Sequence, residues 1–298
     1  DFVLCTGEPF ILFLYGHKLR KKFGVRWIAD YRDMWKNNHN ARFRNDVLSR
    51  ILKWWEWQFE KRIVKTACFV TTTEPHNQET LKYRLSKKVV IVYNGFDEFY
   101  TPQSKPAKSN KLILTHTGTI LQGQQPEFLI EAISQLHLEK KISPADIELR
   151  FVGIKFYRDQ IQRLLSINNQ LESYMVFTDR ISASEALALN AESDYLISLV
   201  DPEYKTISVK TYHYLSVQKP ILVLPGDKSL LSAIVDECNA GLSFYSVQDL
   251  KNFILEQIQI KKSGLPITDK QIDLGAASFY KRENQTKIFS EYLTSALN

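Results

Sequence analysis

The sequence predicts an α/β protein with two Rossmann-like domains, and three observations lead to that prediction. Short apolar segments typical of strands alternate with amphipathic segments typical of helices, which is the rhythm of β-α-β units and a parallel sheet. The rhythm occurs twice, on either side of residues 101–110 (TPQSKPAKSN), a Pro-, Ser- and Lys-rich stretch typical of a linker. A length of 298 residues with 44% hydrophobic content is enough for two domains with separate cores.

The first domain is predicted to span residues 1–100. Its strand segments are residues 2–5, 25–29, 68–72 and 89–93, and its helix segments are residues 10–22, 45–66 and 74–85. The Asn94-Gly95 pair after the last strand indicates a tight turn, because both residue types tolerate a positive φ. The chain begins directly in a strand-like segment, DFVLC, without an initiating Met, so we expect this domain to be incomplete at its N-terminus.

The second domain is predicted to span residues 111–278, with a last helix within residues 279–298. Its strand segments are residues 111–116, 147–152, 175–177, 195–200 and 221–224, and its helix segments are residues 127–138, 159–167, 184–191, 228–237 and 249–260, with one more between Ser208 and Pro220. Pro126 is placed to open the first of these helices, and Ser182 with Glu185 forms a capping box.

The stretch from residue 204 to 224, YKTISVKTYHYLSVQKPILVL, combines basic, aromatic and apolar residues in a helix followed by a strand. Ser208 is a suitable N-cap, Pro220 ends the helix, and the apolar run 221–224 is typical of a buried parallel strand. The unpaired N–H groups at the start of this helix, together with Lys210, favour an anion in the ligand crevice of an open α/β sheet. A diphosphate fits that chemistry.

Residues at the ends of other predicted strands, in both domains, are further site candidates. Gly118 sits at the end of strand 111–116, and glycine there lets backbone N–H groups approach a phosphate. Gly153 follows strand 147–152 in the same way. Arg32 and Asp33 follow strand 25–29 in the first domain, where α/β folds also place their sites. For these two residues, a salt bridge that holds the loop and a contact with a ligand are equally supported.

Composition limits the classes of partner. The formal charge of +6 and pI near 9.0 fit nucleic acid, anionic lipid or phosphate-bearing substrates, but no nucleic-acid module or long basic tract is present. Cys5, Cys68 and Cys238 are far apart, which suggests neither a disulfide framework nor a metal cluster and fits a reducing cytoplasm. No apolar run approaches the roughly 20 residues that span a bilayer.

The predicted helix 45–66 carries Trp54, Trp55 and Trp57 among several Lys and Arg residues. A basic helix with tryptophans is typical of a helix lying at a membrane interface. Tryptophans on a long helix more often pack against the protein, so packing is the first interpretation and peripheral membrane contact the alternative.

Several motifs resemble those of a bacterial subgroup of GT-B glycosyltransferases of family 4. The matching segments are Thr6-Gly7-Glu8-Pro9, WIADYRDMW at residues 27–35, Asn94-Gly95-Phe96-Asp97, THTGTI at residues 115–120 with Pro126-Glu127, Lys210 with His213-Tyr214-Leu215, KPIL at residues 219–222 and NAGL at residues 239–242. The tryptophan-flanked motif is the most specific, since a long match of mixed residue types is improbable by chance. The resemblance extends from Asp1 to the C-terminus of this sequence, but it omits about the first third of a full family member.

The resemblance implies a fold and an activity. The fold is GT-B, two Rossmann-like domains with a C-terminal helix that crosses back to the first. The activity is transfer of a sugar from a nucleotide-sugar donor to a saccharide or lipid-linked acceptor, with retention of configuration, in cell-surface polysaccharide or glycolipid biosynthesis at the inner face of the membrane. We expect no cofactor, no metal and no nucleic-acid partner. The expected catalytic residues are Arg32 and Asp33, and the expected donor-binding residues are Gly118, Thr119, Gln124, Gly153, Lys155, Lys205, Lys210 and His213.

Three positions depart from the family pattern. Phe13, Gln124 and His213 stand where the family has His, Arg and Glu. These departures favour a second hypothesis, a binding or scaffold protein that keeps the fold without catalysis. A nucleotide-sugar epimerase shares the fold too, but it needs a positioned acid–base pair, and the sequence nominates none.

Overall fold

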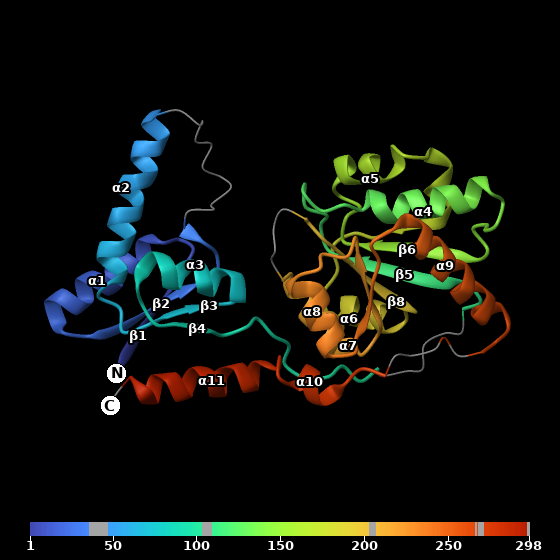
Figure 1. The fold of residues 1–298 in the computed structure, drawn as a ribbon. Helices are drawn as coiled ribbons and strands as arrows, with labels where there is room; N and C mark the ends of the chain where they lie inside the picture. Colours follow the sequence, from blue (N-terminus) through green and yellow to red (C-terminus); the bar gives the residue numbers. More distant parts are fainter. Residues whose placement is uncertain (36–46, 103–108, 203–206, 266, 268–270, 297–298) are drawn as a thin grey trace. The chain divides into compact units, whose positions relative to one another are not determined.

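The computed structural model describes residues 1–35, 47–102, 109–202, 207–265, 267 and 271–296 (Figure 1). The chain divides into two compact units. Unit 1 comprises Asp1–Asn94 and Glu283–Asn298, and unit 2 comprises Gly95–Arg282. Each unit is an α/β layer structure around its own parallel sheet, as the alternating pattern predicts.

Unit 1 holds a four-stranded parallel sheet in the order β1-β2-β3-β4. The strands are β1 (Phe2–Gly7), β2 (Arg26–Tyr31), β3 (Val70–Thr72) and β4 (Val89–Ile91), and the helices are α1 (Ile11–Phe23), α2 (Val47–Val64), α3 (Pro75–Leu85) and α11 (Arg282–Ser295). β2 is an almost fully buried run, which is typical of a strand covered on both faces.

The two faces of this sheet pack against different helices. Trp27 and Tyr31 of β2 belong to a core shared with α1, α2 and α3. Ile28, between them in the chain, belongs to a second cluster that includes Phe69, and Phe289 of α11 packs on that cluster. The side-chain amide of Gln285 on α11 also accepts a hydrogen bond from the Tyr93 N–H, at 2.9 Å. The prediction that the last helix returns to the first domain is therefore confirmed.

Unit 2 holds a six-stranded parallel sheet in the order β10-β9-β8-β5-β6-β7. The strands are β5 (Leu112–Thr117), β6 (Ile147–Val152), β7 (Met175–Phe177), β8 (Tyr195–Leu199), β9 (Ile221–Leu224) and β10 (Gly241–Ser243). The helices are α4 (Glu127–Leu138), α5 (Arg158–Leu165), α6 (Ala183–Ala191), α7 (Val209–Val217), α8 (Leu230–Glu237), α9 (Val247–Lys262) and α10 (Leu274–Ser278), with a 3₁₀ helix at Asn169–Tyr174.

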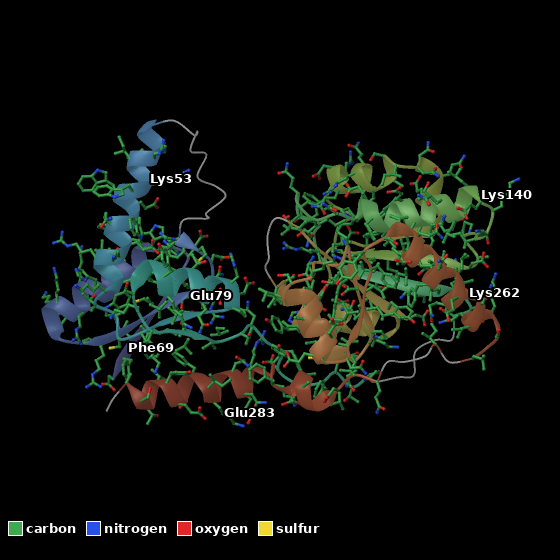
Figure 2. All side chains as sticks on the ribbon, viewed as in Figure 1. Lys53, Phe69, Glu79, Lys140, Lys262 and Glu283 are labelled. Atoms are coloured by element: carbon green, nitrogen blue, oxygen red, sulfur yellow. The ribbon has the colours of Figure 1, made fainter. Side chains whose placement is uncertain are left out.

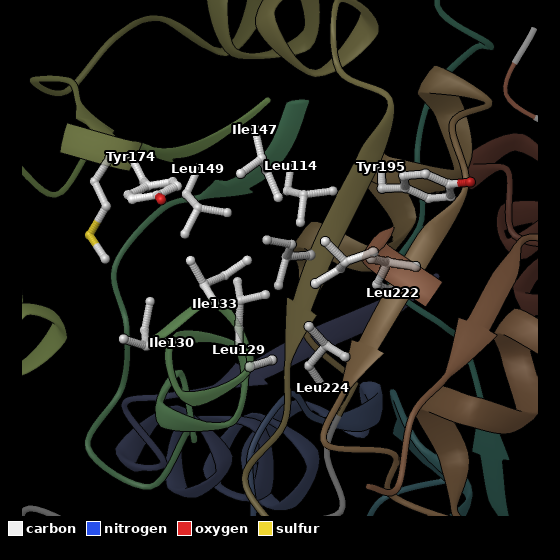
Figure 3. Close-up of a cluster of buried hydrophobic side chains, with 14 of the residues drawn as sticks. Leu114, Leu129, Ile130, Ile133, Ile147, Leu149, Tyr174, Tyr195, Leu222 and Leu224 are labelled. Carbon is white, nitrogen blue, oxygen red and sulfur yellow. The ribbon is translucent and has the colours of Figure 1, made fainter. Parts of the chain in front are cut away.

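The core of unit 2 fills the space between the sheet and helices α4 and α9. Figure 3 shows Leu129 and Ile133 of α4 facing Leu114, Leu149 and other strand residues. Each of these four named side chains is 0–1% exposed, so this face of the sheet is close-packed. The opposite face carries the contacts of α6, α7 and α8 with β5, β8 and β9.

Strand order in unit 2 reverses beside β5. The chain proceeds from β5 to β6 and β7 in one direction, and then resumes at β8 on the other side of β5 and continues to β9 and β10. In open parallel sheets, ligands bind outside the carboxyl ends of the strands at such a reversal. This topology marks the ends of β5 and β8, at Thr117 and Leu199, as the edge where a site belongs.

Several sequence predictions need correction. The Asn94-Gly95 turn does not use a positive φ. Gly95 instead allows a close approach, since a Cβ there would lie 2.3 Å from the Tyr280 carbonyl oxygen. The last helix begins at Arg282 because the preceding residues pair with the chain around Phe96, which forms an isolated β-bridge with Lys281. Six residues of the predicted linker, 103–108, lie outside the described part of the chain.

Candidate functional site

The beginning of α7 carries Lys210. Ser208 is the N-cap and accepts a hydrogen bond from the Lys210 N–H at 3.4 Å, as the sequence predicts. The helix ends at Val217, and Gln218 takes a positive φ of 61° before Pro220. Capping fixes the first turn of the helix, so that the Lys210 side chain reaches from there to the end of β5.

Gly118, directly after β5, makes room for Lys210. It has a φ of 89°, and a Cβ at this position would lie 2.9 Å from Cε of Lys210. Gly153, directly after β6, has a φ of 88°, and a Cβ there would lie 3.9 Å from the Cα of Gly118. The two glycines therefore form adjacent bends at the strand ends, with the lysine chain passing over one of them.

The N–H groups of the two glycines themselves are engaged within the protein. The N–H of Gly118 donates to the Val152 carbonyl at 2.7 Å, and the N–H of Gly153 donates to Thr178. Both bonds hold the strand ends together, which leaves neither N–H for a phosphate. For the N–H of Thr119, the next residue, the described part of the chain provides no acceptor. In this loop, Thr119 is thus the better backbone donor for an anion.

The Lys210 ammonium is held by two acceptors. Its Nζ donates to the Thr119 carbonyl at 2.8 Å and lies 3.3 Å from Nε2 of His116. The other ring nitrogen of His116 lies 3.0 Å from the Ile197 carbonyl, so Nδ1 carries the proton and Nε2 accepts from the ammonium. An ammonium has three N–H donors, and one of them remains for a ligand.

Burial controls the charge of both groups. It lowers the pKa of His116 to about 3, with the positive charge of Lys210 adding to the effect, so the imidazole is neutral at physiological pH. Burial also lowers the pKa of Lys210 to about 8, and the lysine keeps its charge at pH 7. The pair thus presents a single positive charge, partly desolvated, at the end of β5.

Further hydrogen bonds fix this strand end. The hydroxyl of Tyr214, four residues after Lys210 on α7, accepts a hydrogen bond from the Thr117 N–H at 2.9 Å. Burial raises the pKa of Tyr214 to about 12, so the phenol stays protonated. The Thr117 hydroxyl in turn donates to Asn190 of α6 at 2.7 Å. Sequence reasoning did not select His116, Tyr214 or Asn190, although His116 lies inside the THTGTI motif.

Gln124 supports the loop that follows Gly118. Its side-chain NH₂ donates to the Leu199 carbonyl at 3.0 Å, and its side-chain oxygen accepts from the Leu121 N–H at 2.9 Å. Arg163 of α5 donates to the Gln124 carbonyl at 2.6 Å and pairs with Glu127. Gln124 is only 7% exposed, and its amide is engaged at both ends. The Gln124 side chain therefore holds the loop, and its part in donor binding is a proposal.

The other expected donor-binding residues lie apart from the lysine. Lys155 is exposed and pairs with Asp179 at 3.1 Å. His213 is exposed on α7. Partial desolvation of its ring and the charge of Arg282 lower its pKa, and the charge of Asp97 acts in the opposite direction. Lys205 lies outside the described residues. The structure therefore brings together Gly118, Thr119, Gly153 and Lys210, and places His213 beside Asp97 and Arg282 instead.

Arg32 and Asp33 follow β2 in unit 1. Nε of Arg32 donates to Asp30 at 2.9 Å and its Nη1 donates to Asn94 at 3.0 Å. Asp30, which is 4% exposed, also accepts hydrogen bonds from the hydroxyls of Thr6 and Thr71. Arg32 thus forms a loop-holding salt bridge, but with Asp30 rather than Asp33, while its side chain stays 43% exposed.

The described residues contain neither a cluster suited to a metal ion nor a membrane-spanning helix. No group of three or more His, Cys, Asp or Glu side chains is arranged to hold a metal ion there. Within the same residues, no helix has both the length and the apolar character needed to cross a membrane.

The two Rossmann-like sheets and the returning helix α11 define the GT-B architecture of glycosyltransferases. No family model matches the sequence, and no curated protein matches it. Solved structures do match. The structure of Anabaena HepE in complex with UDP and glucose has a TM-score of 0.68 at 15% identity, over 98% of this chain and 78% of that one. Sucrose-phosphate synthase from Thermosynechococcus elongatus has a TM-score of 0.67 at 15% identity, over 99% and 73%.

A third match is the pneumococcal O-GlcNAc transferase GtfA in complex with UDP and GlcNAc. Its TM-score is 0.63 at 11% identity, over 100% of this chain and 57% of that one. At these identities, the similarity establishes the fold.

Proposed function

We propose that this chain is a glycosyltransferase that moves a sugar from a nucleotide-diphosphate donor to a saccharide or lipid-linked acceptor. The observation that carries the proposal is the Lys210 ammonium, held against Gly118 at the strand-order reversal of unit 2. Structures with the same fold contain UDP with glucose or with GlcNAc, which supports a nucleotide-sugar donor here. Membership of family 4 and a role in polysaccharide or glycolipid biosynthesis are parts of the same proposal.

The proposed chemistry needs a stabilised leaving group. The bond between the anomeric carbon and a diphosphate oxygen breaks, the acceptor hydroxyl forms the new bond and loses its proton, and a nucleoside diphosphate leaves. Negative charge develops on the diphosphate, where Lys210, the Thr119 N–H and the first turn of α7 supply positive potential. Charge neutralisation by these groups is our basis for proposing a metal-independent reaction, and retention follows only from the family resemblance.

His116 has a positioning role in this proposal. It accepts a hydrogen bond from Nζ of Lys210 while its Nδ1–H is fixed by the Ile197 carbonyl. Because the imidazole is neutral and buried, it orients the ammonium without adding a competing charge. The Lys210 side chain is therefore preorganised before a diphosphate binds.

We assign the acceptor side of the reaction to unit 1, with Arg32 and Asp33 as its functional residues. Both are exposed after β2, and Arg32 is oriented by Asp30 and Asn94. The three free cysteines fit the cytoplasm as the compartment.

A binding protein without transferase activity is the alternative that specific observations favour. Phe13 is 0% exposed and packs 4.8 Å from the ring of Tyr31, so this position in the core of unit 1 has an aromatic rather than a polar role. Gln124 is committed to the loop, and His213 lies beside Asp97 and Arg282. Such a protein would still bind a nucleotide diphosphate at Lys210, but it would release no sugar.

Thermal unfolding in the presence of UDP, GDP and ADP, and of their glucose conjugates, tests the proposal. A ligand that binds only the folded state raises its stability by about 2.7 kcal/mol at 100 times its Kd. We expect one nucleotide class to raise the Tm of the unit 2 transition and its sugar conjugate to be consumed when acceptors are added. Stabilisation without sugar release supports the binding protein, and the absence of stabilisation by every nucleotide contradicts both.

A further inference from the structure

Helix α2 extends beyond the core of unit 1. Its last turns are anchored by Ile63 and Val64, which are 2% and 0% exposed, and by the buried Glu60. From Arg50 to Phe59, by contrast, every residue is exposed or half-buried. Figure 2 shows this part of the helix with its side chains and labels Lys53. About half of an 18-residue helix therefore has little protein around it.

The exposed half carries an apolar face. Ile51, Trp55 and Phe59 recur at four-residue spacing and form one stripe, with exposed fractions of 49%, 64% and 47%. Leu52 and Trp54, which are 46% and 52% exposed, flank the stripe. We call these five residues the α2 face. Isolated exposed apolar residues are normal, but five large ones on two to three turns of one helix mark an interaction surface.

The aromatic side chains of the α2 face are held in place. The ring of Phe59 lies 6.5 Å from that of Trp35 in an edge-on arrangement, and Trp54 and Trp55 are 5.6 Å apart in a similar one. The indole N–H of Trp35 donates to Glu56 at 2.9 Å. The α2 face is thus positioned before any partner arrives.

Positive charge surrounds the α2 face. Arg50, Lys53, Lys61 and Arg62 lie on the same helix, and its two acidic residues are engaged, Glu56 with Trp35 and Glu60 with Arg84. The asymmetry extends to the whole unit. Residues 1–94 contain 18 Lys and Arg against 9 Asp and Glu, whereas residues 95–282 contain 20 against 22. The net charge of +6 is therefore concentrated in unit 1, the unit that carries the α2 face.

Charge decides between the candidate partners. A second copy of the chain would bring two strongly basic units together, and like-charge contact opposes such a dimer. A nucleic acid would satisfy the cations, but it offers no apolar volume for Ile51 and Leu52. The interface of an anionic bilayer suits both the apolar side chains and the cations of α2. Acyl chains accept the apolar stripe, indoles favour the headgroup level, and Lys and Arg contact phosphate.

We propose that the α2 face docks this protein on the surface of an anionic lipid bilayer, with α2 as an interfacial helix. The inference is independent of the donor site, because no residue of unit 2 contributes to it. A lipid-linked acceptor would then be within reach of the unit that carries Arg32 and Asp33.

Co-sedimentation with vesicles tests the inference. The full chain, without nucleotide, is mixed with vesicles of phosphatidylcholine alone and of phosphatidylcholine with phosphatidylglycerol. We expect binding to the anionic vesicles, a blue shift of tryptophan emission, and a decrease in binding with added salt. The double variant Trp55→Ala with Phe59→Ala is expected to lower the partition coefficient about tenfold or more, because two apolar side chains no longer insert.

The matched control is Tyr83→Ala, which removes an aromatic that is 89% exposed on α3 of the same unit and should leave binding unchanged. Circular dichroism checks that each variant folds. Failure to bind anionic vesicles, or equal loss in the control, contradicts the inference. So does a dimer that the Trp55→Ala, Phe59→Ala variant dissociates, since the partner would then be a second copy. None of these results changes the outcome of the nucleotide measurements.

Discussion

At the scale of single residues, the proposed donor site depends on Lys210, whose pKa is lowered by burial. The pKa of Lys210 is about 8 in the folded protein. The ammonium attracts a diphosphate and the neutral amine does not, so affinity is present below this pKa and is lost as the pH rises through it. A nucleoside diphosphate does not titrate in this range, since the last phosphate pKa is near 6.

We therefore expect the affinity for the bound nucleoside diphosphate to fall by up to about tenfold between pH 7 and pH 9, the range in which Lys210 loses its proton. Calorimetry across this range measures the effect. The profile of Lys210→Ala should be flat over the same interval. A wild-type profile that is equally flat would mean that Lys210 does not carry the binding charge.

His116 provides a second test at this scale. His116→Leu leaves the buried Ile197 carbonyl without its donor and Lys210 without one of its two acceptors. We expect a loss of about 1–3 kcal/mol in the free energy of unfolding and weaker nucleotide binding. His116→Gln, whose amide can both donate and accept, should recover part of the binding. Equal nucleotide affinity in the wild type and His116→Leu would refute the positioning role.

At the scale of elements, the loop between β5 and α4 is held by the side chain of its own Gln124 and by Arg163 of α5. Gln124 connects the Leu121 N–H to the Leu199 carbonyl, and Arg163 donates to the Gln124 carbonyl. The loop therefore holds the Thr119 carbonyl, and with it Lys210, in a fixed position.

Gln124→Arg introduces the cation of the family 4 pattern that the sequence resembles, and it should destabilise this chain. The substitution removes the acceptor for the Leu121 N–H and places a charge in a site that is 7% exposed. We expect a loss of about 1–3 kcal/mol in the free energy of unfolding, measured by denaturant titration. Gln122→Arg, at an exposed position of the same loop, is the control and should be close to neutral. A Gln124→Arg variant that is as stable as the wild type and binds nucleotide more tightly would instead show that a cation at this position contributes to donor binding.

Much of the element pattern could be predicted from sequence, and the reasons are local. Strands 147–152, 175–177 and 221–224 and helix 127–138 match the structure residue for residue, because a buried parallel strand is an apolar run and because Pro126 and the capping residues mark helix ends. The 3₁₀ helix at Asn169–Tyr174 and the five-residue α10 lack a periodic signal long enough to detect.

The candidate site was predictable in part. Lys210 and Gly118 follow from the capping signal and from glycine at a strand end, and the structure places them in contact. The partners of Lys210 do not follow, because the His116–Lys210 contact joins residues 94 positions apart. Gly95 was assigned to a turn because its contact is also distant in sequence. The glycine is needed there because the Tyr280 carbonyl approaches it closely.

At the scale of the whole molecule, the chain passes from unit 1 into unit 2 after Asn94 and returns to unit 1 after Arg282. The chain leaves unit 2 at Arg282, and α11 then packs on the sheet of unit 1, with Phe289 6.3 Å from Phe69. Stability of unit 1 thus depends on the last residues of the sequence, while unit 2 has its own core.

Phe289→Ala should therefore lower the stability of unit 1 selectively. We expect a loss of about 2–4 kcal/mol, below that of a fully buried phenylalanine because Phe289 is partly exposed. Differential scanning calorimetry should show the unit 1 transition at a lower temperature, with the nucleotide-sensitive transition of unit 2 unchanged. Tyr83→Ala again serves as the control. A uniform shift of both transitions would contradict separate cores.

In the proposed function, unit 2 binds the diphosphate of a nucleotide sugar through Lys210. The most direct measurement is isothermal titration of the stabilising nucleoside diphosphate into the wild type and Lys210→Ala at pH 7, with Lys262→Ala as the control, since Lys262 is an exposed lysine on α9 (Figure 2). We expect Lys210→Ala to weaken binding by about 1.5–3 kcal/mol, the contribution of a charge-assisted hydrogen bond, and Lys262→Ala to leave it unchanged. Unchanged affinity in Lys210→Ala would show that Lys210 does not bind the diphosphate.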